Sequence, residues 1–484
     1  MLPYQNLIRL DRQSSVPIYV QMVNQLVQLI QKGQLSANTK LPGTRKLASL
    51  LAINRNTVVR AIEELEATGW VEIRPNRGAF VATNLPQLKT RKWSITPSAQ
   101  KDEQIQYHQF PELHAPTASS GMLGFDDGLP DVRLAPIDAL AKAYTRNLRK
   151  LAASRDLRYS DAMGNAALRN ALANMLNTTR GLNIDANQIL ITRGTIMAIH
   201  LAFAASIQRG DKVIVGTSNY FTANMVIRYF GGKLIQVPVD QNGIVVEAVA
   251  AICSQQTIRA IYVTSHHHHP TTVTLSPERR LTLMQLAEKY GFIILEDDYD
   301  YDFHYDNNPI LPLKSNDRLG QVLYFGSFTK AIAPAFRVGF LVAPSSLIHS
   351  LVKLRRILDR QGDQVLEATI AELLEDGTIR RHLRKSWKQY KDRRDYLASL
   401  LSHELGDRIA FQVPAGGLAI WTHFNLNVSF DQLKERAKKN QLQLSNASFE
   451  CTEKWSASRL GFASLNFREI DECIDKLKKT IQVL

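Results

Sequence analysis

A lysine in the second half of the chain lies in a segment suited to covalent cofactor chemistry. Gly326–Lys330 (GSFTK) follows a short apolar run that predicts a strand, and Arg337 comes seven residues after the lysine. A lysine amine held at the end of a strand can form a Schiff base with a carbonyl cofactor. The hydroxyl of Ser327 and the guanidinium of Arg337 are suited to bind a phosphate group on that cofactor.

Two more polar side chains follow the apolar run Phe292–Leu295. Asp297 and Tyr299 are two residues apart, so their side chains point the same way in extended backbone. A carboxylate can hold a protonated pyridine nitrogen, and a phenol can hydrogen-bond a ring hydroxyl. Pyridoxal 5'-phosphate (PLP) requires such partners, so the pattern predicts a PLP site.

Earlier in the chain, Gly194 and Thr195 lead from a predicted strand into a predicted helix. A glycine and a hydroxyl residue at a helix N-terminus are typical of phosphate binding. Tyr220 follows the next strand, where its ring is placed to stack on a pyridine. Since ligands bind at the carboxyl ends of parallel strands, we expect all these residues to form one site.

The strands that must position these residues are short and continuously apolar. They alternate with helical patterns, which predicts a largely parallel sheet buried on both faces in an α/β domain. A basic helix and a mixed segment after about residue 379 predict a smaller C-terminal α+β subdomain. The predicted strands are 189–192, 212–215, 259–263, 292–295 and 321–325.

The remaining chain predicts a separate N-terminal unit. Four prolines and many polar residues make 84–120 a predicted linker. It joins a head, residues 1–83, to a body, residues 121–484. Within the body we expect a large part over about 150–375 and a small subdomain over about 380–484.

Helical periodicity and turn residues predict the fold of the head. Helices are expected over 18–32, after Thr44 as N-cap through Leu51, and over 55–67 with Asn54 as N-cap. A strand–turn–strand pattern follows over 70–81. Three helices and a hairpin in this order are typical of a winged helix-turn-helix. The head carries ten Lys and Arg residues against five Asp and Glu.

The same elements place basic side chains for contact with DNA. Arg55 and Thr57 lie in the first turn of the third helix, which would enter the major groove. Arginine can bind guanine with two hydrogen bonds, and threonine suits a phosphate or a thymine methyl group. Arg45 begins the preceding helix near phosphate, and Gly78 lets the hairpin approach the duplex. The expected DNA-binding residues are Arg45, Arg55, Thr57, Arg60, Arg77 and Gly78.

Over residues 41–81 the head resembles the GntR family of winged-helix repressors, and the body looks like a fold-type I aminotransferase. Together they resemble the MocR/GabR subfamily of GntR regulators. The motifs that carry the likeness in the body are Phe125-x-x-Gly128-x-Pro130-Asp131, Tyr159 with Gly164, Arg180-Gly181, Glu296–Asp300 and Arg459–Ala463.

The resemblance implies roles for single residues. Lys330 would hold PLP as an internal aldimine, Asp297 would pair with the pyridine nitrogen, and Tyr299 with the ring hydroxyl. Arg459 matches the arginine that grips an amino-acid carboxylate. Bodies of this type pair into homodimers, and two heads would then read two separated half-sites on an operator.

One stretch departs from the family pattern. Residues 265–272 read SHHHHPTT, in which His267 matches the family histidine beside the cofactor, whereas His268, His269 and Thr272 do not match. No metal is expected there, because adjacent residues alternate faces and no carboxylate or cysteine pattern accompanies the histidines. The role of His266–His269 stays open at this point.

Composition sets wider limits. The formal net charge is +14, which favours polyanionic partners. Three scattered cysteines make neither a disulfide framework nor a zinc site, and no apolar run is long enough for a transmembrane helix. With no secretory signal, we expect a cytoplasmic protein without membrane contact.

These observations predict a transcription regulator whose DNA binding responds to PLP, an amine or an amino acid. The alternative is a working aminotransferase that carries a DNA-binding head, and both need the same residues. A third reading, a body that only dimerises, is disfavoured because Lys330, Asp297, Tyr299 and Arg337 are all present.

Overall fold

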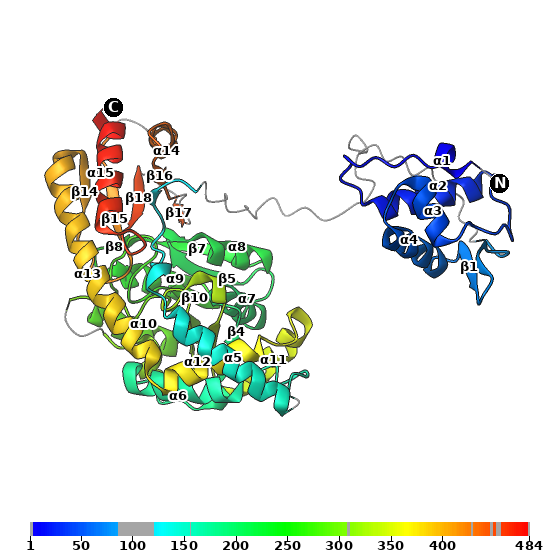
Figure 1. Ribbon diagram of the computed structural model, residues 1–484. Coiled ribbons are helices and arrows are strands. Elements are labelled where there is room, and N and C mark those ends of the chain that lie inside the picture. The colour runs from blue at the N-terminus through cyan, green and yellow to red at the C-terminus, as the bar shows by residue number, and fades with distance from the viewer. Residues whose placement is uncertain are drawn as a thin grey trace. The chain divides into compact units, whose positions relative to one another are not determined.

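The structure is a computed structural model that describes residues 3–85, 121–154, 156–306, 310–426, 429–445, 449–451 and 456–482. Its internal contacts divide the chain into two units, Met1–His108 and Gln109–Leu484 (Figure 1), and each is described by itself. The predicted linker, residues 84–120, falls almost wholly outside the described residues. No described helix is both long and apolar enough to cross a membrane.

The head contains the three predicted helices and the predicted antiparallel hairpin, preceded by one further short helix. Its apolar side chains form one cluster in which Met22, Leu26 and Val58 are fully buried. A four-residue first helix was not predicted, since it is too short to show a periodic pattern. The elements are α1 (Tyr4–Leu7), α2 (Ile18–Gln31), α3 (Thr44–Leu51), α4 (Arg55–Ala67), β1 (Val71–Arg74) and β2 (Gly78–Val81).

The two predicted helix caps have different outcomes. Asn54 caps α4, and its side chain accepts a hydrogen bond of 2.8 Å from the backbone N–H of Asn56. The prediction for Thr44 is wrong, because Gly43 is the N-cap of α3 and makes no side-chain cap. The chain turns into the helix one residue earlier than expected, so Thr44 is already helical.

The body is built on a seven-stranded sheet in the order β4-β13-β12-β11-β10-β5-β7. Neighbouring strands from β12 to β7 are parallel, while β13 runs antiparallel to both β12 and β4. All five predicted strands belong to this sheet; β7 and β13 were not predicted. The strands are β4 (Ile189–Thr192), β5 (Lys212–Gly216), β7 (Lys233–Val237), β10 (Ala260–Val263), β11 (Ile293–Asp297), β12 (Val322–Ser327) and β13 (Gly339–Val342).

Helices bury both faces of this sheet, which explains why its strands are apolar on both sides. One face packs against α7, α8 and α11. The other packs against α9 and α10 towards one edge and against α5, α6 and α12 towards the other. The helices are α5 (Ile137–Ala153), α6 (Ala166–Arg180), α7 (Thr195–Ser206), α8 (Phe221–Tyr229), α9 (Val246–Gln255), α10 (Pro277–Tyr290), α11 (Ser345–Leu358) and α12 (Gln364–Glu375).

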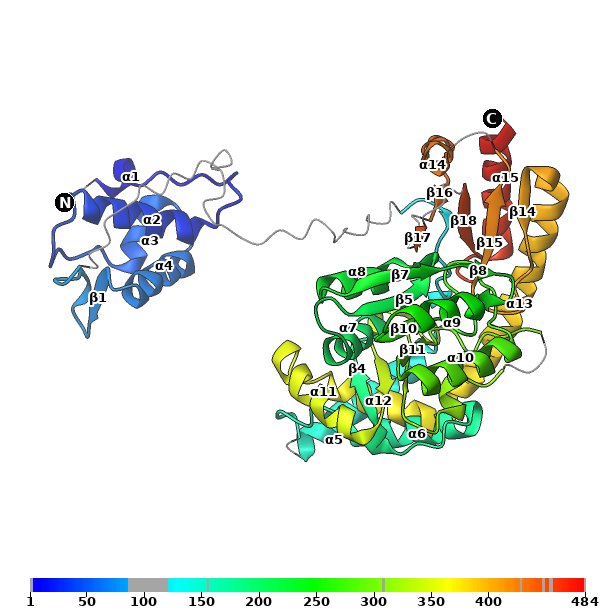
Figure 2. The ribbon, with the colours of Figure 1, turned by 180° about the vertical axis from the view of Figure 1, so that it is seen from behind.

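The C-terminal part forms a smaller layer of helices on an antiparallel sheet of order β14-β15-β18. Its longest helix, α13, runs alongside both this sheet and the large part (Figure 2). The elements are α13 (Thr378–Leu405), β14 (Ile409–Phe411), β15 (Ala419–Phe424), α14 (Phe430–Lys439), β18 (Ala457–Gly461) and α15 (Phe467–Gln482). Two-stranded pairs are β16 (Gln443–Leu444) with β3 (Gly124–Phe125), β17 (Phe449–Cys451) with β6 (Ser218–Tyr220), and β8 (Val239–Asp240) with β9 (Gly243–Ile244).

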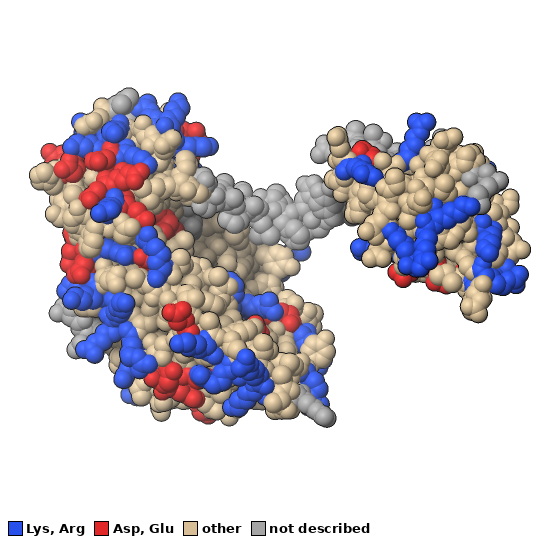
Figure 3. Space-filling model, in the orientation of Figure 1, with Lys and Arg blue, Asp and Glu red and all other residues tan. Residues whose placement is uncertain are grey.

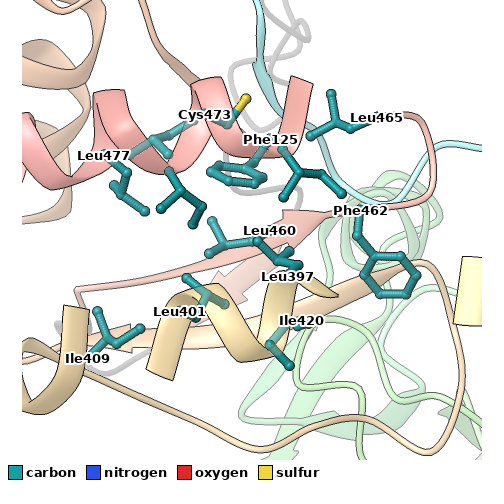
Figure 4. Packing of buried hydrophobic residues seen from close by; sticks show 14 of the residues in the cluster. Phe125, Leu397, Leu401, Ile409, Ile420, Leu460, Phe462, Leu465, Cys473 and Leu477 are labelled. Carbon is teal, nitrogen blue, oxygen red and sulfur yellow. The ribbon is translucent and has the colours of Figure 1, made fainter. Parts of the chain in front are cut away.

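A segment from the start of the body belongs to the core of this smaller layer. Phe125 is fully buried among Leu460, Phe462 and Cys473 (Figure 4). The backbone N–H of Gly461 donates to the carbonyl oxygen of Asp126 at 2.9 Å. These contacts fix the residues that follow Phe125 beside β18.

Candidate functional site

Seven of the predicted site residues line one cavity of about 170 Å³ in the body. They come from the ends of β6, β11 and β12, from the segments that follow β11 and β12, and from the start of α7 after β4. The seven are Thr195, Tyr220, Asp297, Tyr299, Ser327, Lys330 and Arg337. Six residues that were not predicted complete the lining, namely Asp127, Ile196, Tyr262, Thr264, His269 and Thr329.

One end of the cavity is suited to bind an anion. Helix α7 starts there at Thr195, and its first N–H groups have no partner within the helix. The hydroxyls of Ser327 and Thr329 and the guanidinium of Arg337 lie on the same lining. Gly194 has φ +83°, and a Cβ there would lie 2.7 Å from Nη2 of Arg337, so only glycine lets the arginine lie this close.

A carboxylate at the end of β11 is poised for a cationic partner. Asp297 is buried; its Oδ2 accepts a hydrogen bond of 2.7 Å from the hydroxyl of Tyr262, while its Oδ1 has no partner among the described residues. Burial, aided by the charges of Asp298 and Asp300, raises the pKa of Asp297 to about 7. A protonated pyridine nitrogen would satisfy the open oxygen, so this residue fits PLP.

The amine of Lys330 lies in the same cavity. Its Nζ donates to the carbonyl oxygen of Gly128. Burial lowers the pKa of Lys330, although the nearby carboxylates of Asp127 and Asp126 oppose that shift. A lysine with a lowered pKa spends more time as the neutral amine, which is the nucleophilic form.

Two predicted aromatic residues line the same cavity as this lysine. The hydroxyl of Tyr299 donates to the carbonyl oxygen of His267 at 3.0 Å. The ring of Tyr220 meets the ring of His269 edge-on, with centroids 5.2 Å apart. His267 itself is outside the cavity lining, where its Nδ1 lies 2.7 Å from Oδ1 of Asp300. His269, not His267, therefore presents an imidazole to the cavity.

The four consecutive histidines each have a separate partner. His266, His267 and His269 lie 3.3 Å, 2.7 Å and 3.0 Å from carboxylate oxygens of Asp298, Asp300 and Asp127, in that order. The fourth, His268, has its Nδ1 2.8 Å from the hydroxyl of Thr271. These acids lie far from the histidines along the chain, so the local sequence gives no sign of the pairing. Among the described residues, no group of three or more His, Cys, Asp or Glu side chains is placed to hold a metal ion.

Arg459 lies behind the cavity, outside its lining. It is 2% exposed; its Nε is 2.8 Å from Oδ1 of Asp127, and its Nη1 donates to the carbonyl oxygen of Pro270 at 2.9 Å. The carboxylate of Asp127 lines the cavity and bridges Arg459 and His269. The residue assigned to an effector carboxylate is thus already paired with a carboxylate of the chain.

The predicted DNA-binding residues lie on the surface of the head. Arg55 is exposed in the first turn of α4, and Thr57 beside it is half-buried. Arg45 and Arg77 are exposed, and Gly78 has φ +99°. Arg60 packs its guanidinium on the ring of Tyr19, 4.1 Å from the centroid. Basic side chains gather over α3, α4 and β1 on the face that Figure 3 shows.

Comparisons with known proteins agree with both halves of this description. Residues 18–81 match the gntR family of bacterial regulatory proteins, and residues 121–477 match aminotransferase class I and II. An uncharacterized HTH-type transcriptional regulator, YdfD of Bacillus subtilis, is 26% identical over 98% of each chain. The probable rhizopine catabolism regulatory protein MocR of Rhizobium meliloti is 26% identical over 98% of this chain and 96% of its own.

Solved structures match the body. A kynurenine aminotransferase of Pyrococcus horikoshii has a TM-score of 0.70 at 26% identity, and the match covers 75% of this chain and 92% of that one. The predicted fold class and family are therefore confirmed. The chain belongs to the aminotransferase class I and II family and, with its gntR-type head, is a MocR-type transcriptional regulator with an aminotransferase-like domain.

Proposed function

We propose that this regulator binds PLP at Lys330 and that chemistry at this buried site changes how the head binds DNA. The observation that carries the proposal is the open Oδ1 of Asp297, buried in the same cavity as the amine of Lys330. An unpaired carboxylate oxygen in that position is unfavourable unless a ligand supplies a proton or a cation.

When bound, PLP supplies an aldehyde that reacts with amines and a pyridine ring that withdraws electrons. Asp297 would hold the ring nitrogen in its protonated form. The N-terminus of α7 after Gly194, with Ser327 and Arg337, would hold the phosphate. Tyr220 and Tyr299 would flank the ring. His267 would act indirectly, through its contact with Asp300.

Borohydride reduction followed by peptide mass spectrometry tests the cofactor assignment. The purified protein is expected to absorb in the visible range, and reduction is expected to fix the cofactor on Lys330. Lys330→Ala should abolish both signals, whereas Lys289→Ala, a control on the body surface, should keep both. A label on another lysine, or on none, would contradict the assignment.

A second function is favoured by one finding, the likeness of the body to a kynurenine aminotransferase. The groups that bind PLP for sensing also serve transamination, so the body could turn over an amino donor. A turnover assay with amino acids and a 2-oxo acid distinguishes the two. Sustained product formation over many turnovers would favour the enzyme.

On the DNA side, we propose that Arg55 and Thr57 contact base edges while Arg45, Arg60, Arg77 and Gly78 face the phosphate backbone. Residues 1–83 would act as the head, joined by residues 84–120 to a body, residues 121–484, that forms a homodimer. A single head spans too few base pairs for adequate discrimination, so a homodimer would read two half-sites. Light scattering and footprinting test this, and a monomer on one contiguous site would contradict it.

A further inference from the structure

The loop before Gly128 places an acidic side chain between the cavity and Arg459. Asp127 lines the cavity beside Lys330, and its Oδ1 is 2.8 Å from Nε of Arg459. Arg459 itself is 2% exposed and is absent from the cavity lining. A ligand in the cavity therefore meets the carboxylate of Asp127 before it meets the guanidinium.

Contacts on both sides hold Asp127 in its charged form. Its Oδ2 is 3.0 Å from Nε2 of His269, so each carboxylate oxygen faces a nitrogen. Burial alone would raise the pKa of Asp127, but His269 and Arg459 outweigh that effect and hold the pKa below its usual range. Asp127 is therefore a fixed negative charge at the pH of a cell.

The backbone around Asp127 cannot easily move aside. Oδ1 of Asp126 accepts hydrogen bonds of 2.7 Å from the N–H groups of Gly128 and Leu129, and its Oδ2 accepts one of 2.6 Å from the hydroxyl of Ser464. Gly128 packs so closely that a Cβ there would lie 3.2 Å from Nη2 of Arg459. The loop is thus tied to the small subdomain on one side and to the arginine on the other.

This arrangement separates two classes of amine ligand. The α-carboxylate of an amino acid would have to approach Arg459 next to Asp127, and two like charges in a buried site repel strongly. An amine with no such carboxylate meets no repulsion, and its own ammonium or hydroxyl groups can donate to the remaining lone pairs of Asp127.

We propose that the effector is a primary amine without an α-carboxylate and that Asp127 is the residue that selects it. The proposal rests on the proposed function, because the amine would react at the cofactor held by Lys330. In this chain Arg459 then serves to hold Asp127 in place, and the ligand meets Asp127 instead of the guanidinium.

Matched ligand pairs test the selection on the full-length protein loaded with PLP. The pairs are ornithine with putrescine and tyrosine with tyramine, which differ only by the carboxylate. Two readouts are followed, the absorbance of the cofactor and the affinity for operator DNA by fluorescence anisotropy. Each amine is expected to reach half-saturation at a concentration at least about tenfold lower than its parent amino acid.

Asp127→Asn removes the negative charge and frees Arg459, so the preference should shift towards the amino acid by about tenfold or more. Asp392→Asn, a control at an exposed position on α13, should keep the wild-type preference. If Asp127→Asn fails to fold, the wild-type titration still tests the expected preference, because equal affinity for both members of a pair would overturn the proposal.

The outcomes separate the two proposals. Wild-type protein that carries the cofactor but binds the amino acids as tightly as the amines would overturn the selection by Asp127 and leave the proposed function standing. Protein with no cofactor on Lys330 would overturn the proposed function, and the selection along with it. A preference for amines that Asp127→Asn leaves unchanged would assign selection to another residue.

Discussion

The head and the body both use arginine side chains, but in the head they are exposed and in the body the arginine beside the cavity is buried. In the head, Arg45, Arg55 and Arg77 are exposed on the surface that is expected to meet DNA. In the body, Arg459 is buried and is paired with Asp127, whose half-buried side chain lines the cavity. An exposed arginine can pair with any polyanion and is screened by salt. A charge that is held by a buried partner keeps one geometry, so the body is suited to discriminate between small ligands.

The largest test of this contrast is Asp297→Asn. Removal of the carboxylate that would face a protonated ring nitrogen should weaken PLP binding by about 3–5 kcal/mol, since breaking a buried pair is costly. Titration of the cofactor-free protein, followed by absorbance, measures the change in Kd. Tyr262→Phe, which removes only one hydrogen bond to Asp297, should lose about 0.5–1.5 kcal/mol. Equal losses in both variants would contradict the charge-pairing role.

A pH series tests the same residue in the absence of cofactor. The folded pKa of Asp297 is about 7, above its value in the unfolded chain. Its contribution to stability is therefore present at low pH and lost as the pH rises through 7. Between pH 5 and pH 8 the free energy of unfolding should fall by about 3 kcal/mol from this group. Urea denaturation measures the fall.

In that series Asp297→Asn is the control, because its side chain does not titrate. The difference between wild type and variant isolates the one carboxyl from every other group. Bound PLP should also remove the dependence, since a cationic ring nitrogen keeps Asp297 ionised. A wild-type profile parallel to that of the variant would show that Asp297 is not protonated in the folded state.

On the exposed side of the comparison, Arg55→Ala should cost about 1–3 kcal/mol of specific operator binding if the side chain reads a guanine. Binding to unrelated DNA should change much less. Fluorescence anisotropy with operator and scrambled duplexes measures both, and Arg209→Ala, which removes an exposed charge from the body, is the control. Full specific binding by the Arg55 variant would remove it from the recognition surface.

The smallest effects are expected from Arg45→Ala and Arg77→Ala. Each should weaken binding to every sequence alike and reduce the slope of log K against log salt by about 0.9, because one phosphate contact is lost. Anisotropy titrations over a range of salt concentrations give the slope. A loss confined to the operator would mean that these residues read bases.

The same contrast explains which features the sequence could predict. Local sequence patterns were enough to predict the helices of the head, the five apolar strands and the segment from Ser327 to Arg337. The fold class that these elements indicated is confirmed by the family match. Seven predicted residues line one cavity because strands of a parallel sheet end at a common edge.

The features that the sequence did not reveal depend on contacts between distant segments. Asp127 reaches the cavity because Phe125 is packed in the core of the small subdomain, far along the chain. Tyr262 lies within an apolar strand, and its hydroxyl was the one feature of that strand that indicated a polar partner. His269 was noticed because it departs from the family pattern, but its pairing with Asp127 could be recognised only from the structure.

The self-contained hydrophobic cluster of the head has a practical consequence. Every residue of that cluster, from Tyr4 to Val81, comes from the head, and the last described residue packed against it, Leu85, lies at the start of the predicted linker. Because the head has its own core, it should be possible to replace it with another gntR-type head. The hybrid should then bind a different promoter and keep the proposed ligand response of the body. In a reporter strain, such a hybrid would make the proposed amine preference of the body measurable as expression from a chosen promoter.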